Sequence, residues 1–220
     1  MSRYASIRHI LWDWNGTLLD DVDLCLFALN ELCRKRRLPL VSREEYRAKF
    51  TFPVIEYYKS VGFDFEKEPF EGPAQEWVAL YTGNVRQRAR LYDGATEALT
   101  LLHERGYRQS ILSAHQHDML VETVGYFGLA GFFAPILGLG DYYAHSKLEL
   151  GEAWLRESGH DPRHVLMIGD TLHDHEVARA MGAPCLLLAQ GHQLRARLER
   201  AGAPVLSSID EVPGYLDRRP

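Results

Sequence analysis

Cysteine is scarce in this chain, with only Cys25, Cys33 and Cys185 among 220 residues. An odd and sparse set of thiols does not form a disulfide framework, so we expect buried free thiols and a reducing compartment. Long apolar runs are also missing, because stretches such as residues 185–189 are far too short to span a bilayer. No apolar segment follows Met1, so we expect no signal peptide, no membrane partner and a cytoplasmic location.

Neither sign of charge dominates, since 25 Lys and Arg face 30 Asp and Glu for a formal net charge of -5. This mildly acidic balance lacks the basic surface of a general nucleic-acid binder, so we expect no nucleic-acid partner. Hydrophobic residues make up 46% and charged residues 25%, which is ordinary globular composition. We find no internal repeat, and the length fits one large domain that carries a smaller one.

Short apolar runs without alternation recur along the chain and are typical of strands buried in a parallel sheet. These runs are residues 7–12, 109–112, 136–139, 165–168 and 184–188. Helical patterns lie between them and each ends next to a glycine, at residues 95–105, 118–127, 148–158 and 174–181. Alternating strands and helices predict an α/β fold with a doubly wound, Rossmann-like parallel sheet. Ligands of such sheets bind beyond the carboxyl ends of the strands.

Residues 20–90 interrupt this rhythm, because no clear strand occurs there. Helical patterns cover residues 21–36, 54–61 and 73–90, and Ser42 with Glu45 has the form of a capping box. We therefore predict a small all-helical cap domain at 20–90, inserted into a catalytic core made of residues 1–19 and 91–220. An insert directly after the first strand lies above the strand ends, where the ligand is expected.

Polar groups follow the predicted strands, and together they indicate phosphoryl transfer. They are the segment Asp13-Trp14-Asn15-Gly16-Thr17, Ser113, Lys147 and the segment Gly169-Asp170-Thr171-Leu172-His173-Asp174. A carboxylate can attack phosphorus, and further carboxylates and carbonyl oxygens suit Mg²⁺. A hydroxyl, an ammonium group and backbone N–H groups can hold phosphate oxygens. Each group alone is explained by a turn, a helix cap or a solvated charge. These ordinary explanations do not account for all of the groups occurring together, in order and each at a strand end.

These motifs make the sequence similar to the phosphohydrolases of the haloacid dehalogenase superfamily, over nearly the whole chain. The insert and the segment Leu91-Tyr92-Asp93-Gly94 resemble the phosphoglycolate phosphatase-like branch with a helical cap. The resemblance implies that Asp13 is the nucleophile and that Lys147 also takes part in catalysis. It implies that the substrate phosphate is held by Thr17, Ser113, Ala114 and Lys147. It implies that Mg²⁺ is bound by Asp13, the main-chain carbonyl of Asn15 and Asp170, with Asp174 acting directly or through water.

Asn15 departs from the pattern of this family, which usually has a second aspartate there as general acid and base. An amide cannot take that role, which is typically worth roughly 10²–10⁴-fold. Three interpretations remain: the substrate has a good leaving group such as an acyl phosphate, a histidine replaces the acid with His115 as first candidate, or the protein binds phosphate esters with little turnover. The sequence thus favours a Mg²⁺-dependent phosphohydrolase of small phosphorylated metabolites, with a phosphate-ester sensor as the alternative. On the sequence alone, we expect Asn15→Asp to speed hydrolysis of unactivated esters by close to that factor.

Two other reactions of the superfamily fit less well. The retained metal acids Asp170 and Asp174 disfavour removal of halide. Cleavage of phosphonates needs a lysine of the cap, for which the candidates are Lys35, Lys49, Lys59 and Lys67. A basic run near the predicted hinge, Arg86, Arg88 and Arg90, is a candidate for binding the anionic part of a substrate. The identity of the substrate and the oligomeric state stay open.

Overall fold

The computed structural model describes residues 6–140 and 147–217. Its main sheet has six parallel strands in the order β5-β4-β1-β6-β7-β8. The strands are β1 (His9–Trp12), β4 (Arg108–Gln116), β5 (Ile136–Leu139), β6 (Val165–Gly169), β7 (Cys185–Leu188) and β8 (Val205–Leu206). The predicted fold class is therefore confirmed, and the five apolar runs of the sequence correspond to the strands β1, β4, β5, β6 and β7. The short β8 was not predicted, since two residues carry no readable pattern.

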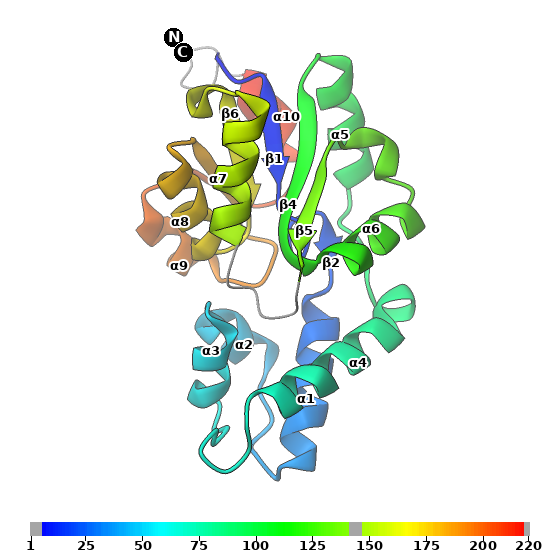
Figure 1. Cartoon of the computed structure of the whole chain (residues 1–220), viewed down its shortest axis with the longest axis vertical. Helices are drawn as coiled ribbons and strands as arrows, with labels where there is room; N and C mark the ends of the chain where they lie inside the picture. Colours follow the sequence, from blue (N-terminus) through cyan, green and yellow to red (C-terminus); the bar gives the residue numbers. More distant parts are fainter. Residues whose placement is uncertain (1–5, 141–146, 218–220) are drawn as a thin grey trace.

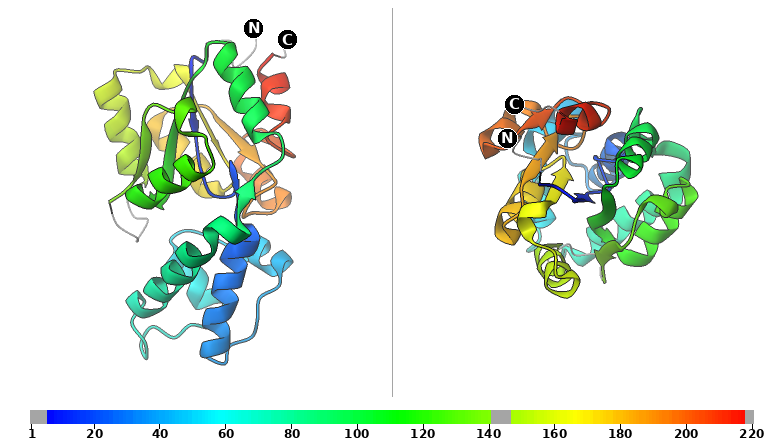
Figure 2. Two further views of the ribbon diagram at one scale, coloured as in Figure 1. Left: turned by 90° about the vertical axis from the view of Figure 1, so that its right-hand side faces the viewer. Right: turned by 90° about the horizontal axis from the view of Figure 1, so that it is seen from above.

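Helices cover both faces of this sheet, as Figures 1 and 2 show. They are α5 (Ala95–Glu104), α6 (His117–Tyr126), α7 (Lys147–Ser158), α8 (Leu172–Met181), α9 (Arg195–Leu198) and α10 (Glu211–Asp217). Three single 3₁₀ turns complete this part, at Ala130–Phe132, Pro162–His164 and Glu199–Ala201. Strand β1 shows why two layers form: Ile10 and Trp12 belong to the apolar cluster that contains α5, α6 and α10, whereas Leu11 belongs to the cluster that contains α7 and α8.

The helical insert consists of α1 (Val22–Lys35), α2 (Arg43–Lys49), α3 (Val54–Ser60) and α4 (Glu71–Arg88). It lies beyond the carboxyl ends of the parallel strands (Figure 1). The predicted capping box is present, because the Ser42 side chain accepts from the Glu45 N–H and the Glu45 carboxylate accepts from the Ser42 N–H. A two-residue antiparallel pair, β2 (Leu19–Asp20) and β3 (Arg90–Leu91), joins the insert to the sheet region. The exact domain boundaries at 19/20 and 90/91 stay a prediction.

The insert is tied to the main sheet region along the edge of α2. The Arg47 guanidinium donates to the carbonyl oxygens of Ala189 and Gly191, each at 2.7 Å, and Gln193 Nε2 donates to the Phe50 carbonyl at 2.9 Å. These bonds fix one side of the insert over the strand ends. None of the helices over the described residues combines the length and apolar character needed to cross a bilayer. All three cysteines are free and buried, as expected.

Candidate active site

Asp13 and Asp170 meet because β1 and β6 are parallel neighbours that end side by side. Asp13 follows β1 directly, and its N–H donates to the Ile168 carbonyl on β6 at 2.8 Å. Asp170 follows the last residue of β6. Two sequence-based placements need correction, since Ser113 lies inside β4 rather than after it, and Lys147 is the first residue of α7 rather than a loop residue. Strand β4 is longer than its apolar run because polar residues continue to pair beyond Leu112.

Lys147 joins two carboxylates at the centre of the site. Its buried ammonium group donates to Asp13 Oδ1 at 2.7 Å and to Asp174 Oδ1 at 2.6 Å. Burial by itself would lower the pKa of Lys147, but the Asp13 and Asp174 carboxylates raise it, so the group stays charged. Burial raises the pKa of Asp13 to about 6, against the opposing effect of Lys147. The lysine therefore holds a fixed positive charge beside the predicted nucleophile.

Asp174 and Asp170 have different surroundings. Asp174 Oδ2 accepts from the Thr171 hydroxyl at 2.7 Å and from the Thr171 N–H at 3.0 Å, in the capping box of α8. Because Lys147 occupies its other oxygen, Asp174 is held mainly by protein donors. Asp170 accepts from the Thr17 hydroxyl at 3.1 Å and from the His192 N–H at 2.6 Å. Burial raises the pKa of Asp170 to about 7, although His192 opposes this change.

The carboxylates suit a divalent cation. One oxygen each from Asp13, Asp170 and Asp174 lies within 4.8 Å of the others, and all three residues are buried. The buried charged groups of the site, over the residues described, are the cations Lys147 and His192 and the carboxylates Asp13, Asp21, Asp170 and Asp174. Two negative charges are left without a counter-charge when all these groups are ionised. Hard oxygen donors with this excess of negative charge fit Mg²⁺.

Glycines make room for Asp170. A Cβ atom on Gly191 would lie 2.1 Å from Asp170 Oδ2, and one on Gly16 would lie 2.4 Å from the same atom. Gly16 also has a φ of +71°, in the left-handed region that favours glycine. Gly16 in the motif is thus needed both for its conformation and for the close approach of Asp170. Nothing in the local sequence points to Gly191, which is brought here only by the chain after β7.

The predicted phosphate-binding residues are only partly brought together. Ser113, Ala114 and Lys147 line the cavity between the strand ends and the insert. The Ser113 hydroxyl oxygen accepts from the His115 N–H at 3.2 Å, which leaves its own proton free to donate. Thr17 is fully buried, does not line that cavity, and donates its hydroxyl to Asp170. In this structure Thr17 therefore orients Asp170 rather than facing the cavity.

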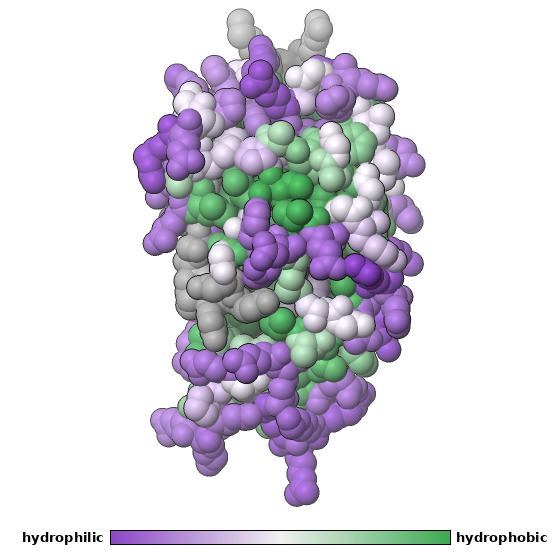
Figure 3. All heavy atoms as spheres, turned by 45° about the vertical axis from the view of Figure 1, so that its right-hand side comes forward, coloured by the Kyte–Doolittle hydropathy of each residue, from purple (hydrophilic) through white to green (hydrophobic). Residues whose placement is uncertain are grey.

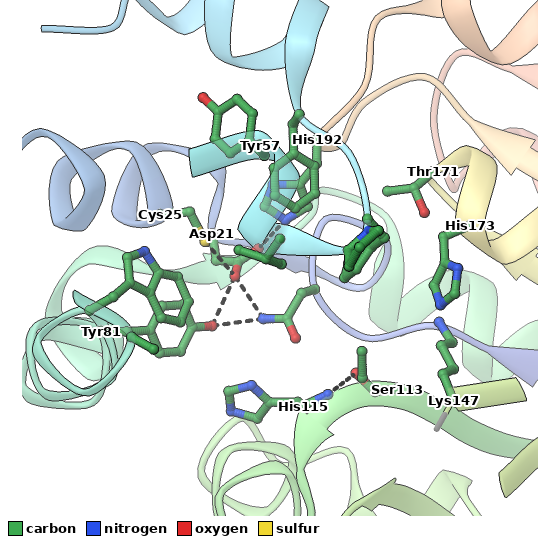
Figure 4. A pocket seen from close by; sticks show the side chains of 18 of the residues that line it. Asp21, Cys25, Tyr57, Tyr81, Ser113, His115, Lys147, Thr171, His173 and His192 are labelled. Carbon is green, nitrogen blue, oxygen red and sulfur yellow. Dashed lines mark hydrogen bonds and ion pairs between the residues drawn. The ribbon is translucent and has the colours of Figure 1, made fainter. Parts of the chain in front are cut away.

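Asn15 belongs to a buried network of hydrogen bonds that no sequence motif indicates. Its amide nitrogen donates to Asp21 Oδ2 at 2.7 Å and to the Tyr81 hydroxyl at 2.8 Å. The Tyr81 hydroxyl also donates to Asp21 Oδ2 at 2.9 Å, and His192 Nε2 lies 3.3 Å from Asp21 Oδ1. Figure 4 shows Asp21 between Tyr81, Cys25 and His192. Both amide hydrogens of Asn15 are thus engaged, and only its carbonyl oxygen is left for a ligand.

The charge states in this network are fixed by mutual contact. Burial would raise the pKa of Asp21, but the His192 imidazolium and the donors around the carboxylate lower it. Burial would lower the pKa of His192, but Asp21 raises it to about 9. An ionised Asp21 can only accept hydrogen bonds, so the amide nitrogen of Asn15 must face it. Asp21 looked like an ordinary residue at a helix start, and neither Tyr81 nor His192 carried a motif.

His115 reaches the cavity in a neutral state. Its ring lies 5.5 Å from the Tyr81 ring, and its buried Nε2 has no hydrogen-bond partner over the part of the chain that the structure describes. Burial lowers the pKa of His115 to about 4. A neutral imidazole keeps one N–H but is a far weaker acid than the imidazolium, so the structure disfavours His115 as the missing general acid.

The cavity itself has a volume of about 290 Å³ and is covered by the insert. The side chains that the insert contributes to the cavity lining are mostly aromatic and aliphatic. They include Phe52, Tyr57, Phe70, Trp77 and Val78. None of the cap lysines suggested for phosphonate cleavage lines it, nor does any arginine of the described residues. Arg86 instead pairs with Glu122, Arg88 lies over the Phe27 ring, and Arg90 pairs with Asp20. These cations do not reach a ligand in the cavity.

Comparison with known proteins agrees with this architecture. The family model of the haloacid dehalogenase-like hydrolases matches residues 10–188. A phosphoglycolate phosphatase from Nitrosococcus oceani is 28% identical over 218 residues, covering 95% of this chain and 96% of its own. A pyrophosphatase, PpaX, from Listeria monocytogenes is 28% identical over 186 residues, covering 80% of each chain.

Similarity in three dimensions extends over the same length. A haloacid dehalogenase-like family hydrolase from Streptococcus pneumoniae superposes with a TM-score of 0.85 at 20% identity, covering 96% of this chain and 99% of its own. The family model spans most of the chain, from the first buried strand to the strand β7 that follows the Asp170 motif. This chain therefore belongs to the haloacid dehalogenase-like hydrolase family.

Proposed function

We propose that the chain is a Mg²⁺-dependent phosphatase that hydrolyses small phosphorylated metabolites through an aspartyl-phosphate on Asp13. The similarity to a phosphoglycolate phosphatase and to a pyrophosphatase supports this reaction class, since both act on phosphoryl groups. The observation that carries the proposal is the chain of contacts Asp13–Lys147–Asp174 at the floor of a covered cavity. A carboxylate paired with a permanent cation is suited to attack a dianionic phosphoryl group.

Each residue has a definite task in this proposal. The Asp13 carboxylate forms the bond to phosphorus, and Lys147 keeps its positive charge next to the phosphoryl oxygens throughout. The free proton of Ser113 would hold one of those oxygens, and Ala114 lines the cavity beside it. Asp13, the main-chain carbonyl of Asn15 and Asp170 would hold Mg²⁺, with Asp174 in support, and the ion would supply positive charge for the transition state. The insert excludes bulk water from the covered site.

A second candidate function is a phosphate-ester sensor with little turnover. It is favoured by the state of Asn15, whose amide hydrogens are held by Asp21 and Tyr81 and cannot serve a leaving group. The phosphate-holding residues do not depend on that amide. A sensor would therefore keep affinity for phosphate esters while it lacks efficient hydrolysis.

The test is release of inorganic phosphate from a panel of phosphorylated metabolites, including acyl phosphates, with and without Mg²⁺. We expect release that stops on chelation and returns with added Mg²⁺. Asp13→Asn abolishes it, whereas the control Asp93→Asn, at an exposed position outside the cavity, keeps the wild-type rate. Tight binding of esters without release in any condition would favour the sensor and contradict the phosphatase.

A further inference from the structure

The cavity is lined on the insert side by flat apolar groups. The Trp77 indole stacks on the Tyr81 ring, with centroids 4.9 Å apart and planes inclined by 23°. Phe52, also of the insert, stacks on the His173 ring of α8, with centroids 4.8 Å apart and planes inclined by 28°. All four side chains line the same cavity as Asp13. Flat, rigid walls of this kind favour a flat apolar ligand, because ring stacking adds to the gain from burial.

The same cavity offers no spare positive charge for a second anionic group. The cations among its described lining residues are Lys147, which Asp13 and Asp174 already engage, and His192, which is paired with Asp21. The cations of the insert lie elsewhere: Arg36 pairs with Glu68, and Lys59 pairs with Glu56. Figure 3 shows hydrophilic residues gathered on the outer end of the insert. A carboxylate on the organic part of the substrate would thus be buried without a partner, which is costly.

Asn15 adds an independent constraint, from the chemistry of the leaving group. With both amide hydrogens bound to Asp21 and Tyr81, it has no proton to give to a departing oxygen. A leaving group that is stable as an anion needs none. Phenols meet this requirement far better than alcohols, since their pKa is near that of tyrosine, about 10.

Resting on the proposed phosphatase function, we propose that the substrate is an aryl phosphate: a phosphate monoester of a phenol whose ring is uncharged and bound between the aromatic walls. The Asp13 oxygen forms the bond to phosphorus while the bond from phosphorus to the phenolic oxygen breaks. The electron pair of that bond leaves with the phenolate, which then takes a proton from water. Water next hydrolyses the aspartyl-phosphate, releasing inorganic phosphate and restoring the Asp13 carboxylate.

Binding is tested with phosphonates, which cannot be hydrolysed, on the wild-type protein in the presence of Mg²⁺. Benzylphosphonate has the shape of phenyl phosphate, and 3-phosphonopropionate has the shape of 2-phosphoglycolate. We expect calorimetry to give a Kd at least about tenfold lower for benzylphosphonate, since an unpaired buried carboxylate costs more than this factor. An equal or lower Kd for 3-phosphonopropionate would overturn the proposal.

Variants of the cavity wall test where the ring binds. Trp77→Leu should weaken benzylphosphonate about three- to tenfold, the range of one aromatic contact, and leave 3-phosphonopropionate within twofold. Phe65→Leu is the matched control, because Phe65 belongs to the insert and packs on Phe63 and Phe70 but does not itself line the cavity. Val78→Arg places a cation in the cavity and should reverse the preference of the two ligands. Unchanged affinities in both Trp77→Leu and Val78→Arg would contradict the proposed position of the ring.

Turnover tests the leaving group separately. Phenyl phosphate and benzyl phosphate have similar rings, but only the first leaves as a phenolate. We expect kcat for phenyl phosphate to exceed that for benzyl phosphate at least about 100-fold, the lower bound of acid catalysis that the site lacks. Equal rates would overturn the aryl assignment. Absence of release from every ester would contradict the phosphatase function itself, whereas the phosphonate affinities would still decide the nature of the ligand.

Discussion

Replacing Asn15 with aspartate restores the residue usual in related phosphatases, yet the structure predicts that this change alone gives little. The Asn15 nitrogen lies 2.7 Å from Asp21 Oδ2, so a carboxyl at position 15 puts an oxygen where a hydrogen-bond donor stood. Two negative charges at this separation repel by about 6 kcal/mol with an effective dielectric constant near 20. One proton is therefore retained between the two carboxyls at neutral pH.

That shared proton decides the outcome. The carboxyl at position 15 donates to Asp21, so it neither gives its proton freely to a leaving group nor accepts one from water. We expect Asn15→Asp to raise kcat on benzyl phosphate less than about tenfold, well short of the 10²–10⁴-fold typical of acid–base catalysis. The larger gain expected from the sequence alone is thus revised, because the sequence does not place Asp21 beside Asn15.

Exchanging the two residues removes the repulsion. In the double variant Asn15→Asp with Asp21→Asn, the amide at position 21 donates to the carboxylate at position 15, and the net charge of the pair is unchanged. We expect this variant to approach the full gain on benzyl phosphate and to change phenyl phosphate much less, since a phenolate needs no proton. Asp21→Asn alone is the control, and it should not accelerate either ester.

The assay is the initial rate of phosphate release at saturating Mg²⁺, over pH 5–9, for both esters and all variants. A full gain in Asn15→Asp alone would refute the coupling of positions 15 and 21. No gain in the double variant would show that this site does not use an acid at position 15 at all.

Further predictions concern other parts of the structure. Lys147→Met leaves the buried Asp13 carboxylate without its cation. We therefore expect the free energy of unfolding, measured in urea, to fall by about 3–5 kcal/mol and phosphate release to vanish. Wild-type stability in this variant would contradict the ion pairs. Gly191→Ala pushes a methyl group against Asp170, so we expect the Mg²⁺ concentration for half-maximal activity to rise at least about tenfold. An unchanged concentration would mean that the backbone at residue 191 shifts away from Asp170. His9 is buried with its pKa lowered to about 4, whereas in the unfolded chain it titrates near 6.5. The unfolded chain therefore binds the extra proton between these pH values, and the free energy of unfolding decreases by up to about 3 kcal/mol as the pH falls from 7 to 4. In His9→Gln, the free energy of unfolding should lack this part of the decrease at low pH. Identical pH profiles of the free energy of unfolding in wild type and variant would refute this role of His9.

The sequence by itself determined the α/β fold and the identity of the motif residues. Buried parallel strands such as residues 165–169 are short apolar runs, and helices such as α8 end at glycine, so both are readable from neighbouring residues alone. Asp13 and Asp170 were predictable because each directly follows such a strand. Once parallel strands are inferred, their carboxyl ends must share one edge of the sheet.

Only the tertiary structure decided what surrounds these motifs. Asn15 meets Tyr81 across 66 positions of sequence, and Asp21 meets His192 from the loop after β7. No periodicity links such residues, because the contact depends on how the insert lies over the sheet. The aromatic residues of the insert are equally ambiguous in sequence, where Trp77 has the pattern of a core residue. Its place in the cavity wall follows from the packing of α4 on α1 above the strand ends. The insert, which the structure describes in full, contributes no lysine or arginine to that wall.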